Sequence, residues 1–275
     1  LRNIGSIRNS GFELQLDGRI IDRAVKWDLG VNFSLNRSKV LVLSEDKDIF
    51  GGELDNTILK DQLNLMRVGE PMYVFYGYVE DGYDENGHIV YKNMDDDPAI
   101  TAADKTIIGD PNPDFLVNLT TAVSYKGFTL SAFFQSSIGN DIYSLSMAAQ
   151  AYDYGYNGNT LREVYYNHWT PENPTAKYPN LDQTSYKMSD RFVYDGSFVR
   201  LKNLELAYDV PCARSKFIKR ARVYVSAQNL FTITSYPFWD PDINANGGGS
   251  SMIQGVDSYC YPSARTYTIG CRLTF

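Results

Sequence analysis

The last stretch of the chain, residues 265–275, alternates strictly between apolar and polar side chains. The apolar set is Tyr267, Ile269, Cys271, Leu273 and Phe275, and the polar set is Thr266, Thr268, Gly270, Arg272 and Thr274. Because successive side chains of a β-strand point to opposite faces, this stretch is predicted to be a strand with one dry and one wet face. The dry face could meet a second sheet in a soluble sandwich. A chain that stops on Phe275 favours instead a strand that seals a closed barrel facing lipid.

Six further stretches show the same alternation and predict six more crossing strands. They are centred near Leu14, Val31, Leu119, Leu130, Leu204 and Val225. Lys126 and Gly127 are predicted to turn a tight hairpin between two of them. A change of phase near Lys202 and Asn203 predicts a β-bulge.

The connections between these strands alternate in length. Short connections are predicted at 19–25, 126–127 and 209–220, and long ones at 37–114, 136–196 and 235–263. The first long connection is predicted to hold a hairpin of its own, with arms at 73–78 and 89–91. Outer-membrane barrels combine short periplasmic turns with long extracellular loops. The fold of a soluble β-sandwich does not require such an alternation. We therefore predict an all-β, transmembrane antiparallel β-barrel fold.

Composition narrows the class further. The 275 residues carry a formal net charge of -7, which argues against nucleic acid or anionic lipid as the main partner. The longest apolar runs fall well short of the roughly 18 residues of a transmembrane helix. Cys212, Cys260 and Cys271 have neither a disulfide pattern nor a zinc spacing. The 21 Tyr, 14 Phe and 3 Trp suit both carbohydrate-binding modules and outer-membrane barrels.

Several blocks of sequence resemble one known family. Residues 195–211 (DGSFVRLKNLELAYDVP), 221–234 (ARVYVSAQNLFTIT) and 240–242 (DPD) resemble the carboxy-terminal barrel of SusC/RagA-type TonB-dependent transporters. Four other blocks resemble further parts of that family in the right order, at 68–71 (VGEP), 75–77 (FYG), 108–113 (IGDPNP) and 139–143 (GNDIY). The resemblance spans essentially the whole chain.

The resemblance implies a barrel of 22 strands in the bacterial outer membrane, with an amino-terminal plug and a TonB-contacting segment. It also implies a SusD-like lipoprotein lid and the import of glycans or peptides. Residues 1–275 are then the carboxy-terminal part of the barrel, and the plug is absent from them. A passive outer-membrane porin and a soluble β-rich carbohydrate-binding module stay open as alternatives.

The number of strands makes a separate prediction. Seven crossing strands are an odd number and too few for a single-chain barrel, and an open edge in hydrocarbon would leave backbone N–H and C=O groups unpaired. The first and last strands are therefore expected to pair with barrel segments from outside these residues, upstream of Leu1.

The long connections carry two candidate sites, while catalysis is not expected. His88 and His168 lack metal-binding or nucleophile-activating spacing, so the chain is predicted not to be an enzyme. Oxygen-bearing side chains fall near the ligand positions of a calcium loop, at Asn93, Asp95, Asp97, Thr101 and Asp104. Pro98 stands where such a loop needs Gly, so a solvated acidic loop stays open as the alternative.

Aromatic side chains are the second candidate, for contact with the substrate or with the lid. They are Tyr152, Tyr154, Tyr156, Tyr165, Tyr166, Trp169 and Trp239. Flat rings stack on sugars and on peptide side chains, and tyrosine hydroxyls add hydrogen bonds. Packing of one loop on another is the alternative explanation.

Overall fold

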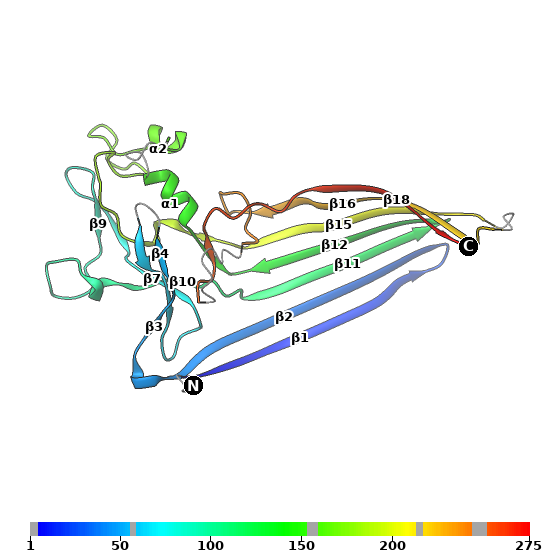
Figure 1. Cartoon of the computed structure of the whole chain (residues 1–275), viewed down its shortest axis with the longest axis horizontal. Coiled ribbons are helices and arrows are strands. Elements are labelled where there is room, and N and C mark those ends of the chain that lie inside the picture. The colour runs from blue at the N-terminus through cyan, green and yellow to red at the C-terminus, as the bar shows by residue number, and fades with distance from the viewer. Residues whose placement is uncertain (1–4, 56–58, 153–158, 213–216, 244–251) are drawn as a thin grey trace.

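Seven long strands form one antiparallel sheet in which chain order and spatial order agree. The computed structural model of the chain describes residues 5–55, 59–152, 159–212, 217–243 and 252–275 (Figure 1). The strands are β1 (Gly5–Asp22), β2 (Val25–Leu43), β11 (Phe115–Tyr125), β12 (Phe128–Ile138), β15 (Phe198–Val210), β16 (Arg220–Thr234) and β18 (Thr266–Thr274). Each contains one of the seven predicted centres, so the prediction of seven antiparallel strands is confirmed.

The register of the sheet places apolar residues on one face and polar residues on the other. One row of directly paired residues crosses all seven strands through Ile21, Trp27, Val123, Leu130, Leu206, Val225 and Ile269. A neighbouring row runs through Arg19, Asp28, Ala122, Ser131, Glu205, Ser226 and Thr268. Directly paired residues of an antiparallel sheet share a face, so the predicted apolar and polar faces are confirmed.

Local backbone features follow the predicted turn and bulge. Lys126 and Gly127 both have positive φ, at 46° and 85°, as a two-residue turn between twisted strands requires. The pairing of β15 shifts register between Leu201 and Asn203 against β16, and the same place is irregular against β12. The extra residue restores the apolar phase of the strand beyond Asn203.

The described residues of the long connections gather at one end of the sheet and form a folded cap, which we define as residues 44–55, 59–114, 139–152, 159–197, 235–243 and 252–265. Figure 1 shows this cap at the end opposite the C-terminus. The largest apolar core of the described residues lies in the cap and draws on all three connections, with Phe75, Tyr143 and Val256 among its members. The sheet itself contributes little to this core, because its apolar face is largely exposed.

Short elements build the cap. The first connection holds β3 (Ile49–Phe50), β4 (Glu53–Asp55), β5 (Lys60–Gln62), β6 (Asn64–Met66), β7 (Val74–Gly77), β8 (Glu80–Tyr83), β9 (Ile89–Tyr91) and β10 (Thr106–Gly109). The second holds β13 (Asp141–Ser144), α1 (Leu145–Tyr152), α2 (Arg162–Tyr166) and β14 (Val193–Asp195), and the third holds β17 (Val256–Asp257). Three single 3-10 turns complete it, at Ser44–Asp46, Ala102–Asp104 and Asp190–Phe192.

Two predictions about the first connection are wrong. The arms at 73–78 and 89–91 do not pair with each other, because β7 pairs with β6 and β10, whereas β9 pairs with β8. The hairpin turn lies at 84–88, where Asp84 accepts hydrogen bonds from the N–H groups of Asn86 and His88. The connection also begins at 44 rather than 37, because β2 continues to Leu43 and buries Val40 in the cap.

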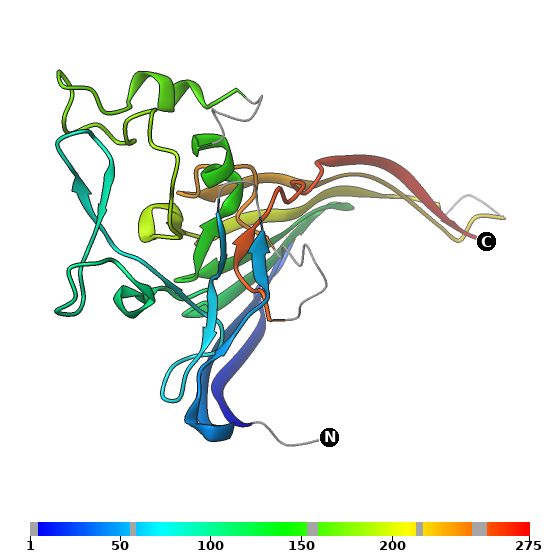
Figure 2. The same cartoon turned by 60° about the vertical axis from the view of Figure 1, so that its left-hand side comes forward.

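The sheet is strongly curved, and its two edges are β1 and β18 (Figure 2). Within the residues that the structure describes, these edge strands do not pair with each other. The same residues include no helix that is both long and apolar enough to span a bilayer.

Candidate functional site

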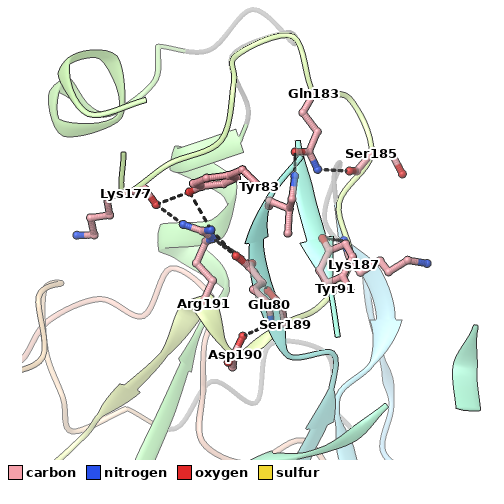
Figure 3. Close-up of polar contacts among 11 residues, drawn as sticks. Glu80, Tyr83, Tyr91, Lys177, Gln183, Ser185, Lys187, Ser189, Asp190 and Arg191 are labelled. Atoms are coloured by element: carbon pink, nitrogen blue, oxygen red, sulfur yellow. Dashed lines mark hydrogen bonds and ion pairs between the residues drawn. The ribbon is translucent and has the colours of Figure 1, made fainter. Parts of the chain in front are cut away.

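A largely shielded ion pair between Arg191 and Glu80 joins the first and second connections of the cap (Figure 3). The Arg191 Nε atom lies 2.9 and 2.8 Å from the two carboxylate oxygens of Glu80 on β8. Glu80 also accepts a hydrogen bond of 2.6 Å from the hydroxyl of Ser189. Arg191 further donates to the hydroxyl of Tyr83 and to the backbone carbonyl of Lys177. The guanidinium thus ties the 3-10 turn at Asp190–Phe192 to β8 and to the segment at Lys177.

The electrostatics of this pair follow from its burial. The side chains of Arg191 and Glu80 are 15% and 10% exposed. Burial alone would lower the pKa of Arg191, but the hydrogen bonds and charge of Glu80 outweigh it, and the pKa is raised. Burial also raises the pKa of Tyr83. The guanidinium of Arg191 is therefore always positively charged, and the carboxylate of Glu80 compensates that charge.

A second buried network joins the second and third connections. The Tyr236 hydroxyl lies 2.6 Å from a carboxylate oxygen of Asp257 on β17 and 2.8 Å from the Ser144 hydroxyl on β13. Ser146 donates to the other oxygen of Asp257. Burial raises the pKa of Tyr236, so the phenol stays protonated and can donate.

Arg200 fastens the third connection to the sheet. It lies on β15 just before the bulge, and its side chain is 2% exposed. It pairs with Asp240 and Asp242 and donates to the hydroxyl of Thr232 on β16, at 2.9 Å. Asp240 also accepts hydrogen bonds from backbone N–H groups of Asp242 and Ser263, and its pKa is lowered although burial alone would raise it. With the two networks above, this makes the cap one connected unit.

The predicted aromatic residues do not form one surface. Tyr152 on α1 is buried and stacks on Tyr186 with ring centroids 3.7 Å apart, so its ring belongs to the cap core. Trp169 is half-buried and covers Gly87 at the tip of the β8–β9 hairpin. Tyr154 and Tyr156 lie outside the described residues.

Three of the predicted aromatic residues are exposed. Tyr165 and Tyr166 project from α2, at 60% and 70% exposure, and their rings meet edge to face. Trp239 is exposed and stacks on Phe238. These three side chains are available for contact with a ligand or a partner, and the substrate or lid contact stays a prediction.

Two exposed tyrosines of the third connection, Tyr259 and Tyr261, were missed. Tyr261 in the third connection is 90% exposed, and Tyr259 beside it has a positive φ of 56°. The local run of tyrosine, proline and serine at 258–263 was the available signal, because small residues and proline keep a segment at the surface.

The predicted calcium loop folds by pairing its oxygens with its own backbone. Asn93 and Asp95 accept hydrogen bonds from the N–H groups two residues further on. The Asp104 carboxylate is inaccessible to solvent and accepts from Met94 and Thr101, at 2.7 Å each. These hydrogen bonds lower the pKa of Asp104. Calcium binding stays a prediction for this loop.

The two histidines of the chain have partners within the cap. No set of three or more His, Cys, Asp or Glu side chains in the described residues could hold a metal ion. His88 contacts Asp182 through Nε2 at 2.8 Å, and His168 contacts the Tyr165 carbonyl through Nδ1. Both histidines lie in connections within the cap.

Two relatives of the chain are both named as TonB-dependent receptors. No family model matches the sequence. The TonB-dependent receptor P3 of Formosa agariphila is 32% identical over the whole chain, which covers 29% of that protein. The TonB-dependent receptor SusC of Bacteroides thetaiotaomicron is 28% identical, again over the whole chain and 27% of that protein.

A solved structure agrees with these relatives. The RagAB peptide transporter superposes on 99% of this chain with a TM-score of 0.80 and 26% identity, over 29% of its own chain. This chain therefore spans less than a third of the length of each of the three. Their names describe receptors and a transporter, not enzymes. The chain is thus homologous over its whole length to part of the SusC/RagA-type TonB-dependent receptors, which are proteins of the bacterial outer membrane.

Proposed function

We propose that these 275 residues are the carboxy-terminal part of a large, 22-stranded barrel that actively imports glycans or peptides across the outer membrane. The observation that carries the proposal is the match of the whole chain, sheet and cap together, to the RagAB peptide transporter at a TM-score of 0.80. In this proposal the apolar face of the sheet meets lipid and the polar face lines the lumen. The cap then lies outside the cell and the short turns lie in the periplasm.

The exposed backbone edges support closure with other polypeptide. β1 and β18 each have a neighbour on one side only among the described residues. Unpaired N–H and C=O groups cost several kcal/mol each in hydrocarbon, so a lipid-embedded sheet needs strands at both edges. We propose that barrel segments from the rest of the protein pair with β1 and β18, and that a plug from the same protein fills the lumen.

Two partners follow from the same proposal. TonB would act through the part of the protein outside these residues, and a SusD-like lipoprotein would cover the cap. The size of the cap and its exposed aromatic side chains, Tyr165, Tyr166, Trp239 and Tyr261, support a protein interface, because aromatic residues are enriched at the centres of interfaces.

Uptake assays on the full-length protein test the proposal. Cells that carry the protein should lose uptake of its nutrient when TonB is deleted, whereas uptake through a passive porin would continue. Purification through a tag on the protein, in mild detergent, should return a lipoprotein companion. Uptake that is independent of TonB, with no companion recovered, would refute the importer.

A further inference from the structure

A basic pocket lies at the end of the sheet opposite the cap, beside the C-terminus (Figure 1). Its volume is about 500 Å³, and residues at the ends of β15, β16 and β18 line it. The charged side chains among them are Asp209, Lys219, Arg220, Arg222 and Arg272. The pocket thus carries four cations and one carboxylate, in a chain whose formal net charge is -7.

The three arginines of the pocket lie on the polar face of the sheet. Arg222 pairs directly with Arg272, and Arg220 pairs directly with Thr274. Arg272 and Thr274 stand four and six residues after Thr268, which belongs to the polar row described above. Residues an even number apart on a strand share a face, and so do directly paired residues. In the proposed function this face lines the lumen, so the arginines point away from the lipid.

The positive charge of the pocket is not balanced within the described part of the chain. Arg222 takes the nearby carboxylates, with Asp209 at 3.3 Å and Glu205 at 3.7 Å. Arg272 stands directly opposite this arginine, and like charges in that position repel each other. The other three cations of the pocket form no side-chain ion pair with any described residue. The pocket therefore lacks anions.

The opposite edge of the sheet shows the balanced arrangement. At the same end of β1 and β2, Arg19 pairs directly with Asp28, and the two side chains meet at 2.8 Å. Opposite charges across a strand pair stabilise a sheet, whereas the two arginines of β16 and β18 destabilise it. An anion from outside these residues would remove that repulsion.

Face and spacing indicate the kind of anion. Lipid phosphates would meet the apolar face, and the arginines are on the other one. A guanidinium binds a carboxylate through two parallel N–H groups. Arg220 and Arg222 are two residues apart on one strand, so roughly 6.8 Å separates their Cα atoms. An extended segment presents its own same-side groups at this spacing, so carboxylates at alternate positions match the arginines.

We propose that the basic pocket binds an acidic segment of the plug, with Asp or Glu at alternate positions, and so fastens the periplasmic side of the plug to the last two strands. This inference rests on the proposed function, because the lumen and the plug both belong to it. Ion pairs between exposed side chains are weak and are screened by salt, so the contact is reversible.

Photo-crosslinking in the full-length protein tests the inference. Benzoylphenylalanine is placed at Thr274, which lines the pocket, and in a separate variant at Ser226, which lies on the polar row away from it. Both should form a crosslink to polypeptide outside residues 1–275. The crosslink from Thr274 should end in a segment with alternate carboxylates. Lys219 lines the pocket just before β16 and is the second position for the crosslinker, if the variant at Thr274 lacks heat-modifiable migration.

Reversal of one charge measures the attraction. Arg272→Glu should speed hydrogen exchange of the crosslinked segment by about 2- to 5-fold, and the effect should shrink at about 0.5 M salt. Arg272→Gln should give a smaller increase, because it removes attraction without adding repulsion. Arg265→Glu makes the same change of charge just before β18, at the other end of that strand, and is the matched control. It should leave exchange of the segment unchanged.

The outcomes separate this inference from the proposed function. A crosslink from Thr274 to phospholipid, or to a segment without carboxylates, would overturn the inference, while a crosslink from Ser226 to the plug would leave the proposed function intact. Equal exchange in Arg272→Glu and Arg265→Glu would also overturn the inference. If neither crosslinker reaches polypeptide outside residues 1–275, the filled lumen of the proposed function is wrong and the inference fails with it.

Discussion

The contact between the first two connections of the cap depends on Arg191. Replacing it by methionine keeps much of the volume but leaves Glu80 buried without a counter-ion, because both side chains are largely shielded. Breaking such a pair from one side costs about 3–5 kcal/mol. We expect Arg191→Met to speed hydrogen exchange in β8 and β9, while the long strands stay protected.

A double variant isolates the charge effect. Glu80→Gln combined with Arg191→Met removes both charges and should restore part of the lost protection, because no uncompensated ion then remains. Equal exchange rates in wild type and Arg191→Met would contradict the role given to this pair.

Asp104 gives a pH dependence with a defined sign. Its pKa is lowered by hydrogen bonds from backbone N–H groups of Met94 and Thr101, so its carboxylate stabilises the loop above the unfolded-state pKa of about 3.9. This stabilisation is lost as pH falls through the lower pKa of the folded state. Hydrogen exchange over 93–106 should rise on acidification in the wild type and should be less dependent on pH in Asp104→Asn.

The same loop can be tested for calcium. If the calcium prediction holds, added calcium should slow exchange over 93–106 at neutral pH, and a chelator should reverse the effect. Asp104→Asn should abolish the response to calcium. If hydrogen exchange of the wild-type loop depends on pH but does not respond to calcium, the calcium prediction is wrong. The role of Asp104 as an acceptor of backbone hydrogen bonds would still hold.

Among the individual elements, β18 offers the cleanest comparison of the two faces. Ile269 lies on the apolar row and is 87% exposed, and Thr268 lies on the polar row. Ile269→Arg places a charge toward lipid and should cost roughly 2–4 kcal/mol near the middle of the bilayer. Thr268→Arg points to the lumen and should be mild. Assembly of the two variants in the outer membrane can be compared by heat-modifiable migration, and equal defects would refute the assignment of faces.

The long strands were predictable because each one carries a period-2 signal of its own. Alternation around Leu14, Val31 or Ile269 depends only on neighbouring residues and on one solvent boundary. The pairing of the short strands was not predictable in this way. β7 pairs with β10 at a sequence separation of about 29 residues. This pairing depends on how buried side chains such as Phe75 pack in the cap core, and the local sequence pattern holds no information about that packing.

The candidate site was predictable only in part for the same reason. Composition located the aromatic residues in the cap but could not say which of them are exposed, and the structure divides Tyr152 in the core from Tyr165 and Tyr166 on the surface.

At the scale of the whole molecule, the open edges give a prediction about assembly. Residues 1–275 produced alone in the periplasm should fail to form a heat-modifiable band and should be degraded by protease, because β1 and β18 lack partners. Production of the rest of the protein as a separate chain in the same cells should rescue assembly. A stable, detergent-resistant monomer of the 275 residues by itself would show that the edges need no outside strands.

The shared core of the cap has a consequence for how the molecule folds and evolves. Contacts that complete it join distant parts of the chain, such as Asn64 to the Gln254 carbonyl and Ser146 to Asp257. Such contacts form only after the chain has lost the conformational entropy of closing long loops. The cap should therefore fold last, after the hairpins of the sheet have brought the ends of its three connections side by side. It also follows that its loops are not interchangeable modules. Grafting one loop from a relative would transfer only one of the three connections that build the cap core. A new specificity would therefore require coordinated replacement of all three connections.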